Sequence, residues 1–202
     1  MDAKTVIACA VGLLLLASGA QGQTDNFQRQ ISGADVQALQ KARTLRAQKR
    51  SAEAVTLLQA LVRRRPDYFN AQYELALALS DKPDGIAASL PVFETAAALK
   101  RSHPEVTDAR VFNSMGWAYM YSGNTAKASA ALAEAQANIQ QLSPENQAKL
   151  YSNLGALHLT AGKRADAEKY LQIAAQKGSQ PAQLRLETLE AVNKRQLALK
   201  RD

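Results

Sequence analysis

The chain has 202 residues, 47% of them hydrophobic and 21% charged, a globular composition that excludes a chain disordered throughout. Aromatic residues make up only 5% and the apolar residues are mostly Ala and Leu, which favours closely packed helices over a core built around a sheet. The formal net charge of +7 indicates that an anionic surface or partner lies nearby.

The first residues have the layout of a secretory signal. Lys4 supplies a positive charge, residues 6–17 form an apolar run, and small residues precede a polar stretch. Cleavage after Ala20 or Gly22 fits this layout. Because the run is shorter than the roughly 20 apolar residues that span a bilayer, a cleaved signal over residues 1–22 is favoured over an uncleaved inner-membrane anchor. We therefore expect a periplasmic or secreted protein.

The single cysteine, Cys9, lies inside the apolar run and is badly placed to be a lipidated first residue. Its removal with the signal leaves a mature chain without disulfides or thiolate metal ligands. Residues 23–34 are polar with few apolar anchors and predict a flexible leader.

Two loose copies of a repeated pattern follow the leader. The first is spread over Ala42, Leu45, Ala54, Leu58, Leu61 and Pro66, and the second reads Leu75-Ala76-x-x-Leu79, then Ser89-x-x-x-Phe93-x-x-Ala96. An interior proline breaks a helix, so we expect Pro91 in the first turn of the helix that carries Phe93.

Two close copies come next, with every landmark at the same internal spacing. They read Phe112-x-x-Met115-Gly116-x-x-Tyr119, Gly123, Ala128-x-x-x-Leu132-x-x-Ala135, and Tyr151-x-x-Leu154-Gly155-x-x-His158, Gly162, Ala167-x-x-x-Leu171-x-x-Ala174. We expect a C-terminal helix over residues 181–202, because apolar residues recur there among many charges.

The landmarks have physical explanations. Glycine inside a helix costs about 1 kcal/mol against alanine, so Gly116 and Gly155 predict contacts with a partner helix that leave no room for a side chain. Gly123 and Gly162 fall where the first helix of each pair ends, a position that favours positive φ. Thr125 is a candidate cap for the helix that follows Gly123.

These residues resemble the tetratricopeptide repeat, in which an aromatic residue, Leu-Gly and Tyr precede Ala and a large apolar residue on a second helix. The resemblance covers residues 35–180. It implies an all-α fold: a right-handed α-solenoid of about four antiparallel helix pairs, closed by residues 181–202 as a capping helix. The first helices of the pairs then line a concave groove.

The groove is where we expect a partner to bind. Residues three and four apart share a helix face, so one line of side chains includes Arg110, Asn113, Trp117 and Tyr121. Lys149 and Asn153 continue it in the next pair, and Tyr73, Arg43 and Arg46 extend it upstream. The resemblance implies that Asn113, Asn153, Arg110 and Lys149 hold a peptide backbone or terminal carboxylate. For Trp117, packing against the neighbouring helix pair is an alternative of equal weight to partner binding. For Tyr121, the alternative to partner binding is that it covers a helix end.

The sequence contains no catalytic motif. It lacks G-x-S-x-G, S-x-x-K, H-E-x-x-H and a phosphate-binding glycine loop. Of the two histidines, His158 takes the place of a repeat tyrosine and is expected to be packed and hydrogen-bonded, while His103 has no obvious partner. We expect no enzyme, cofactor, metal site or nucleic-acid partner.

The sequence thus predicts a scaffold or adaptor of the bacterial cell envelope, and the expected partner is another protein or a peptide segment that is part of an envelope assembly. The alternative is a basic surface that binds anionic envelope polymers or lipid headgroups.

Overall fold

The computed structural model describes residues 31–198, so the predicted signal and most of the predicted leader lie outside the described residues. Within this range the chain is helical and contains no strand. The α-helices are α2 (Gly33–Ala47), α3 (Ser51–Arg64), α4 (Phe69–Ser80), α5 (Ile86–Ser102), α6 (Arg110–Tyr121), α7 (Thr125–Ala137), α8 (Pro144–Thr160), α9 (Arg164–Gln176) and α10 (Gln180–Ala198), with a short 3-10 turn, η1 (Ile139–Gln141), between α7 and α8.

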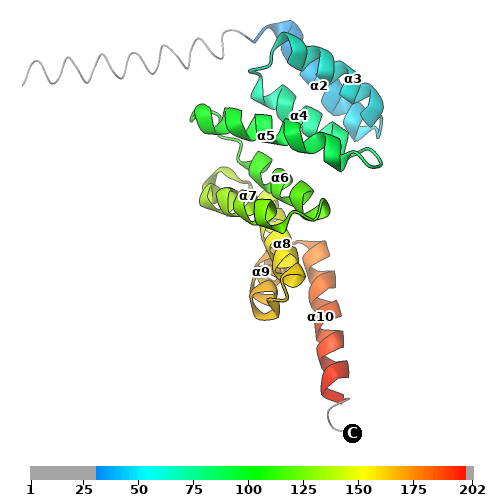
Figure 1. Ribbon diagram of the computed structural model, residues 1–202, viewed down its shortest axis with the longest axis vertical. Helices are drawn as coiled ribbons and strands as arrows, with labels where there is room; N and C mark the ends of the chain where they lie inside the picture. The colour runs from blue at the N-terminus through cyan, green and yellow to red at the C-terminus, as the bar shows by residue number, and fades with distance from the viewer. Residues whose placement is uncertain (1–30, 199–202) are drawn as a thin grey trace, which may run out of the picture.

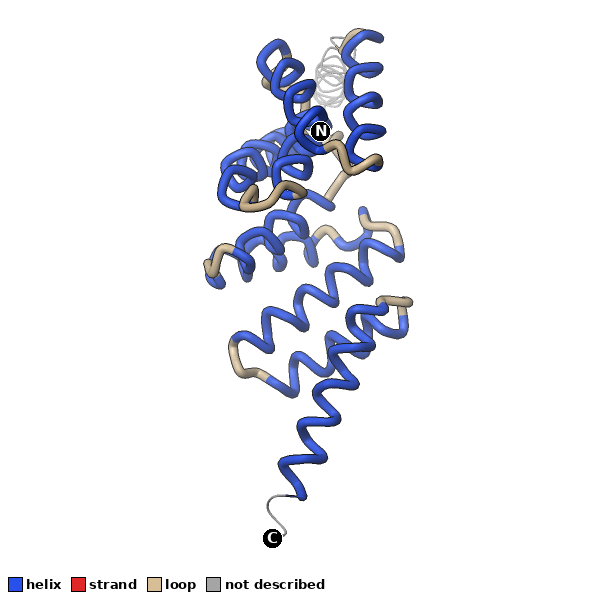
Figure 2. Tube along the Cα trace, turned by 90° about the vertical axis from the view of Figure 1, so that its right-hand side faces the viewer, coloured by secondary structure: helices blue, strands red, loops and turns tan. Residues whose placement is uncertain are grey.

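The helices form four hairpin pairs followed by a cap. α2 packs on α3, α4 on α5, α6 on α7 and α8 on α9, while α10 packs on α9 and α8. The first helices of neighbouring pairs also touch, so the pairs stack into an elongated solenoid (Figures 1 and 2). The predicted all-α solenoid of about four pairs with a C-terminal capping helix is confirmed.

Both ends of the repeat domain differ slightly from the sequence-based boundaries. α2 begins at Gly33 because the Ser32 hydroxyl caps it, accepting a hydrogen bond from the Asp35 backbone N–H at 3.2 Å. The capping helix begins at Gln180.

Small residues make the close packing of the pairs possible. A Cβ added to Gly116 would lie 2.7 Å from Cγ of Leu132, and one added to Gly155 would lie 2.6 Å from Cγ of Leu171. Both positions are also 3.3 Å from a backbone oxygen, that of Ala128 or Ala167. The prediction that these glycines allow close contact with the partner helix is confirmed.

The turn after α6 corrects one detail. Gly123 has φ of 79° and Gly162 has φ of 70°, as their positions predicted. However, Asn124 caps α7 by accepting a hydrogen bond from the Lys127 backbone N–H at 3.0 Å. Thr125 is the first residue of the helix, so its expected role as the cap is wrong.

Pro91 is the second correction, because it lies inside α5 and not in its first turn. The helix starts at Ile86, one turn earlier than expected, and so brings Ser89 into the core together with Phe93, both fully buried. Pro91 itself is exposed, so its ring points away from the core. The burial gained along this face offsets the backbone hydrogen bond that proline cannot donate.

Candidate functional site

A groove of about 640 Å³ runs along the first helices of the pairs. α4, α6 and α8 contribute side chains to it, and the turn between α9 and α10 closes its C-terminal end. The groove therefore begins in the second repeat pair and ends at the cap.

One part of the groove is apolar. Leu77, Phe93, Trp117 and Ala148 line it. Trp117 is half-buried and packs against the exposed ring of Tyr121, with 4.5 Å between the ring centroids. Trp117 thus packs within its own helix and still faces the groove, where a large apolar side chain of a ligand would find an aromatic wall.

An amide pair lies at the middle of the groove. The Asn153 side-chain Nδ2 donates to the Asn113 Oδ1 at 2.9 Å and so connects α8 to α6. Each amide has both donor and acceptor groups, and this single bond uses one donor of Asn153 and one lone pair of Asn113. The Asn113 NH2 group and the Asn153 carbonyl remain to bond the N–H and C=O groups of an extended backbone.

Three cations surround the C-terminal end of the groove. Lys149 Nζ lies 2.6 Å from Glu145 Oε1. Lys177 Nζ donates to Gln147 Oε1 at 3.0 Å, and Arg185 Nη1 donates to Ser152 Oγ at 2.9 Å. Sequence reasoning identified Lys149 and missed Lys177 and Arg185. The predicted capping helix could have indicated these two residues, since a helix that closes the solenoid brings its first turns to the groove.

Arg43 and Arg46, expected at the upstream end, are occupied by carboxylates of α4 and its C-cap. Arg43 Nε lies 2.8 Å from Glu74, and Arg46 bridges Glu74 at 2.5 Å and Asp81 at 2.8 Å. Burial lowers the pKa of Arg46, but the hydrogen bonds and charges of Asp81 and Glu74 raise it above its ordinary value overall. These arginines hold α2 against α4 and do not line the groove.

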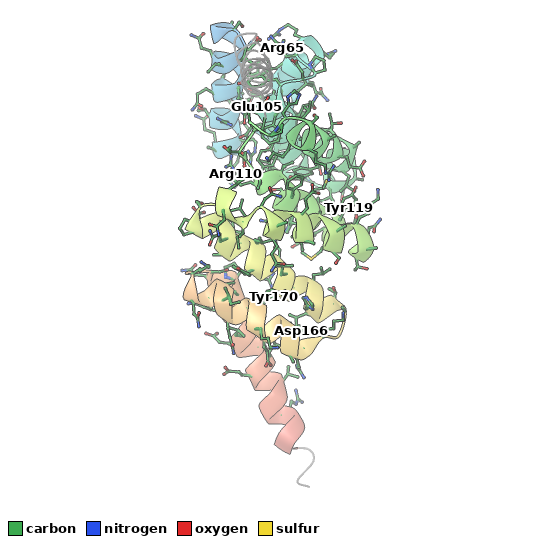
Figure 3. The ribbon with its side chains drawn as sticks, turned by 90° about the vertical axis from the view of Figure 1, so that its left-hand side faces the viewer. Arg65, Glu105, Arg110, Tyr119, Asp166 and Tyr170 are labelled. Atoms are coloured by element: carbon green, nitrogen blue, oxygen red, sulfur yellow. The ribbon has the colours of Figure 1, made fainter. Side chains whose placement is uncertain are left out.

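Arg110 is also occupied, by a carboxylate two residues before it. Its Nε and Nη2 atoms bond both oxygens of Asp108, at 2.8 and 2.5 Å, and this bonding raises the pKa of Arg110. Its guanidinium carbon lies 5.6 Å from the Tyr73 ring centroid (Arg110 is labelled in Figure 3). Arg110 is therefore absent from the groove lining, contrary to the prediction.

Tyr73 and Tyr121 also lie outside the groove lining. Tyr73 is only 3% exposed, and its hydroxyl bonds the Ser114 hydroxyl at 2.9 Å, so the structure places it in the core. Tyr121 is 69% exposed and lies beside the groove without lining it. The sequence-predicted residues that the structure brings together in the groove are Asn113, Trp117, Lys149 and Asn153.

Comparison with known proteins identifies the fold. No protein family matches the sequence, and no curated protein does. Solved structures do match: PilF of Pseudomonas aeruginosa has a TM-score of 0.69 at 18% identity, over 83% of this chain and 72% of that one. The tetratricopeptide-repeat protein TTC0263 of Thermus thermophilus has a TM-score of 0.60 at 22% identity, over 91% and 96%.

MamA of Desulfovibrio magneticus RS-1 also superposes, with a TM-score of 0.58 at 20% identity, over 88% of this chain and 96% of that one. The chain has the tetratricopeptide-repeat fold. At these identities the likeness concerns the fold alone. Tetratricopeptide-repeat solenoids offer an extended concave surface, which is where the groove of this chain lies.

The histidines sit outside the tetratricopeptide-repeat groove. His158 stacks on Tyr170 with 5.1 Å between the ring centroids, as expected for a packed residue, but its buried Nδ1 makes no hydrogen bond and lies 3.8 Å from Asp166 (Tyr170 and Asp166 are labelled in Figure 3). His103 had no obvious partner in the sequence, and the structure places its Nδ1 3.1 Å from Glu105. Between residues 31 and 198 no three His, Cys, Asp or Glu side chains gather at a metal-binding spacing.

None of the helices in that same range is both long and apolar enough to cross a membrane.

Proposed function

We propose that this chain is a non-enzymatic scaffold or adaptor of the bacterial cell envelope, which binds an extended segment of a partner protein in its concave groove. The observation that supports this most strongly is the composition of the groove: an aromatic wall at Trp117, a half-satisfied amide pair at Asn113 and Asn153, and cations at one end. Aromatic and arginine side chains dominate most binding interfaces.

The proposal assigns binding, and no chemistry, to the groove. Catalysis needs a nucleophile beside a base, or an acid and base of matched pKa. The polar groups in the groove are instead amides, hydroxyls and cations, with Glu145 and Asp81 each bonded to a neighbouring cation. Such groups hold a backbone and its side chains in place without activating any bond.

Photocrosslinking tests the proposal. A photoreactive amino acid at Gln180, an exposed residue that lines the groove, should capture a defined protein in envelope extracts. The matched control is the same amino acid at Gln172, which is exposed on α9 outside the groove lining. We expect capture from position 180 alone and its loss on Trp117→Ala. Equal capture from both positions, or capture that survives Trp117→Ala, would contradict groove binding.

The envelope location rests on the signal in residues 1–22. We expect the protein in the periplasmic fraction with an N-terminus that follows Ala20 or Gly22, as read by N-terminal sequencing. Full-length protein that still begins at Met1 in the cytoplasmic fraction would refute export.

A second candidate function is binding of anionic envelope polymers or lipid headgroups by the basic surface, which the net charge of +7 favours. The dependence of binding on salt concentration distinguishes the two candidate functions. Binding to a polyanion weakens steeply as ionic strength rises, whereas a desolvated groove contact is screened much less. Binding to anionic vesicles that is abolished by about 0.5 M salt and is indifferent to Trp117→Ala would favour the second candidate.

A further inference from the structure

The charges along the groove are unevenly neutralised. Outside its lining, Arg43 and Arg46 of α2 are paired with Glu74 and Asp81, and Arg110 of α6 is paired with Asp108. At its C-terminal end Lys177 and Arg185 bond only neutral groups, the Gln147 amide and the Ser152 hydroxyl. Across residues 31–198 no carboxylate lies within ion-pair distance of either cation. One end of the groove therefore keeps positive charge that the described residues leave uncompensated.

Arg185 is held in place and does not extend freely into solvent. Its Nη1 donates to the hydroxyl of Ser152, a residue of α8 that is only 5% exposed. Arg185 comes from α10, so this bond fixes its guanidinium across the joint between the last repeat and the cap. The other N–H groups of the guanidinium have no partner in the described chain, and their planar fork matches the two oxygens of a carboxylate.

Lys149 adds a third cation beside these two. Its partner Glu145 has a side chain that is 77% exposed, and exposed pairs of this kind contribute little stability. The Lys149–Glu145 pair can therefore rearrange when a stronger acceptor enters. The C-terminal end of the groove holds three cations and a single weakly held carboxylate.

On the basis of the proposed function, we propose that the bound segment is an acidic peptide, whose carboxylate side chains occupy a subsite made by Arg185, Lys177 and Lys149. An apolar side chain of the same segment packs on Trp117 and Leu77 at the other end. From α6 to α10 there are two steps between neighbouring helices, roughly 18 Å at 8–10 Å per step. An extended peptide covers this distance in about five or six residues.

Peptide display on the full chain tests this inference. The probe is a random peptide library fused to its carrier through the peptide C-terminus, so that no free terminal carboxylate is present. The wild-type chain should enrich peptides with an apolar residue and, about five residues away, Asp or Glu. For an amidated synthetic peptide from that pool, Arg185→Gln with Lys177→Gln should weaken binding roughly 10- to 100-fold, the range for hydrogen bonds to charged groups.

Charge reversal sharpens the test. Arg185→Glu with Lys177→Glu should shift the selected peptides from acidic to basic. The matched control is Lys41→Glu with Lys169→Glu, which changes the net charge equally at two exposed positions outside the groove and should leave the acidic selection unchanged. Circular dichroism confirms that each variant is folded.

The outcomes separate this inference from the proposed function. Peptides that need Trp117 but carry no acidic residues would overturn the inference and leave groove binding intact. Acidic peptides that bind the glutamate-reversed groove as well as the wild type would also overturn it. If the library yields no acidic peptide but a synthetic acidic peptide with a free C-terminal carboxylate binds and its amidated form does not, the groove recognises a terminus and the inference is wrong. The absence of any peptide sensitive to Trp117→Ala would refute the proposed function itself.

Discussion

The substitution Gly155→Ala tests whether helix packing requires glycine at the repeat landmarks. A Cβ at this position would lie 2.6 Å from Cγ and 2.7 Å from Cδ2 of Leu171, and 3.3 Å from the Ala167 backbone oxygen. Ordinary contacts between carbon atoms are about 3.5–4.0 Å, so α9 must shift or Leu171 must change rotamer. Leu171 is fully buried, so its side chain cannot avoid the new methyl group by moving into solvent.

Two effects of opposite sign compete. Replacing glycine by alanine inside a helix stabilises it by about 1 kcal/mol, while overpacking a core costs about 1–3 kcal/mol. Because two side-chain carbons and a backbone oxygen all resist the new methyl group, we take the upper part of that range. We expect a net loss of about 1–2 kcal/mol in the free energy of unfolding, or roughly 2–8 °C in Tm.

Urea unfolding followed by far-UV circular dichroism measures this change, with Gly33→Ala as the control. Gly33 has no atom within 4 Å of its added Cβ, so its replacement should be neutral or slightly stabilising. A cycle with Leu171→Ala isolates the clash: the double variant should be about 1–3 kcal/mol more stable than the sum of the single effects predicts. If Gly155→Ala stabilises the chain and shows no coupling to Leu171, the packing argument is wrong.

Three further predictions concern the caps, the ion pairs and pH. Asn124→Ala removes the cap of α7 and should cost about 1 kcal/mol in urea unfolding, whereas Thr125→Ala should cost much less. Arg46→Ala removes one of two partners of the buried Glu74 carboxylate and should cost about 1–3 kcal/mol in the free energy of unfolding, measured by urea unfolding. Burial raises the pKa of Tyr73 to about 12. As pH rises, the unfolded chain therefore loses the Tyr73 hydroxyl proton before the folded chain does. The stability that neutral Tyr73 contributes is complete below about pH 10 and disappears as the pH rises towards 12. In unfolding curves measured at alkaline pH, Tyr73→Phe should weaken this dependence.

The fold was predictable because the residues that allow close helix packing recur in the sequence at a fixed spacing. Gly155 and Ala167 recur at the spacing of Gly116 and Ala128, and the structure places each glycine against the second helix of its own pair. Pro91 was harder, because the length of α5 depends on burial of Ser89 against other helices, which local rules for proline do not include.

The groove was only partly predictable, since ion pairs depend on residues far apart in the chain. No residue near Arg46 in the sequence indicates its hydrogen bond to Asp81, which lies 35 residues away. Asp108 lies only two residues from Arg110 and could have been recognised as its partner. Arg185 reaches the groove only through the position of the cap, which the repeat pattern itself does not specify.

Trp117 offers the most direct measurement of the central claim, because it is the chain's only tryptophan and it lines the groove. Titration with a captured partner segment should shift its emission to shorter wavelength, saturate, and give the same Kd as calorimetry, since the ligand removes water from the indole. Tight binding by calorimetry with unchanged Trp117 emission would place the partner elsewhere on the solenoid and contradict the account.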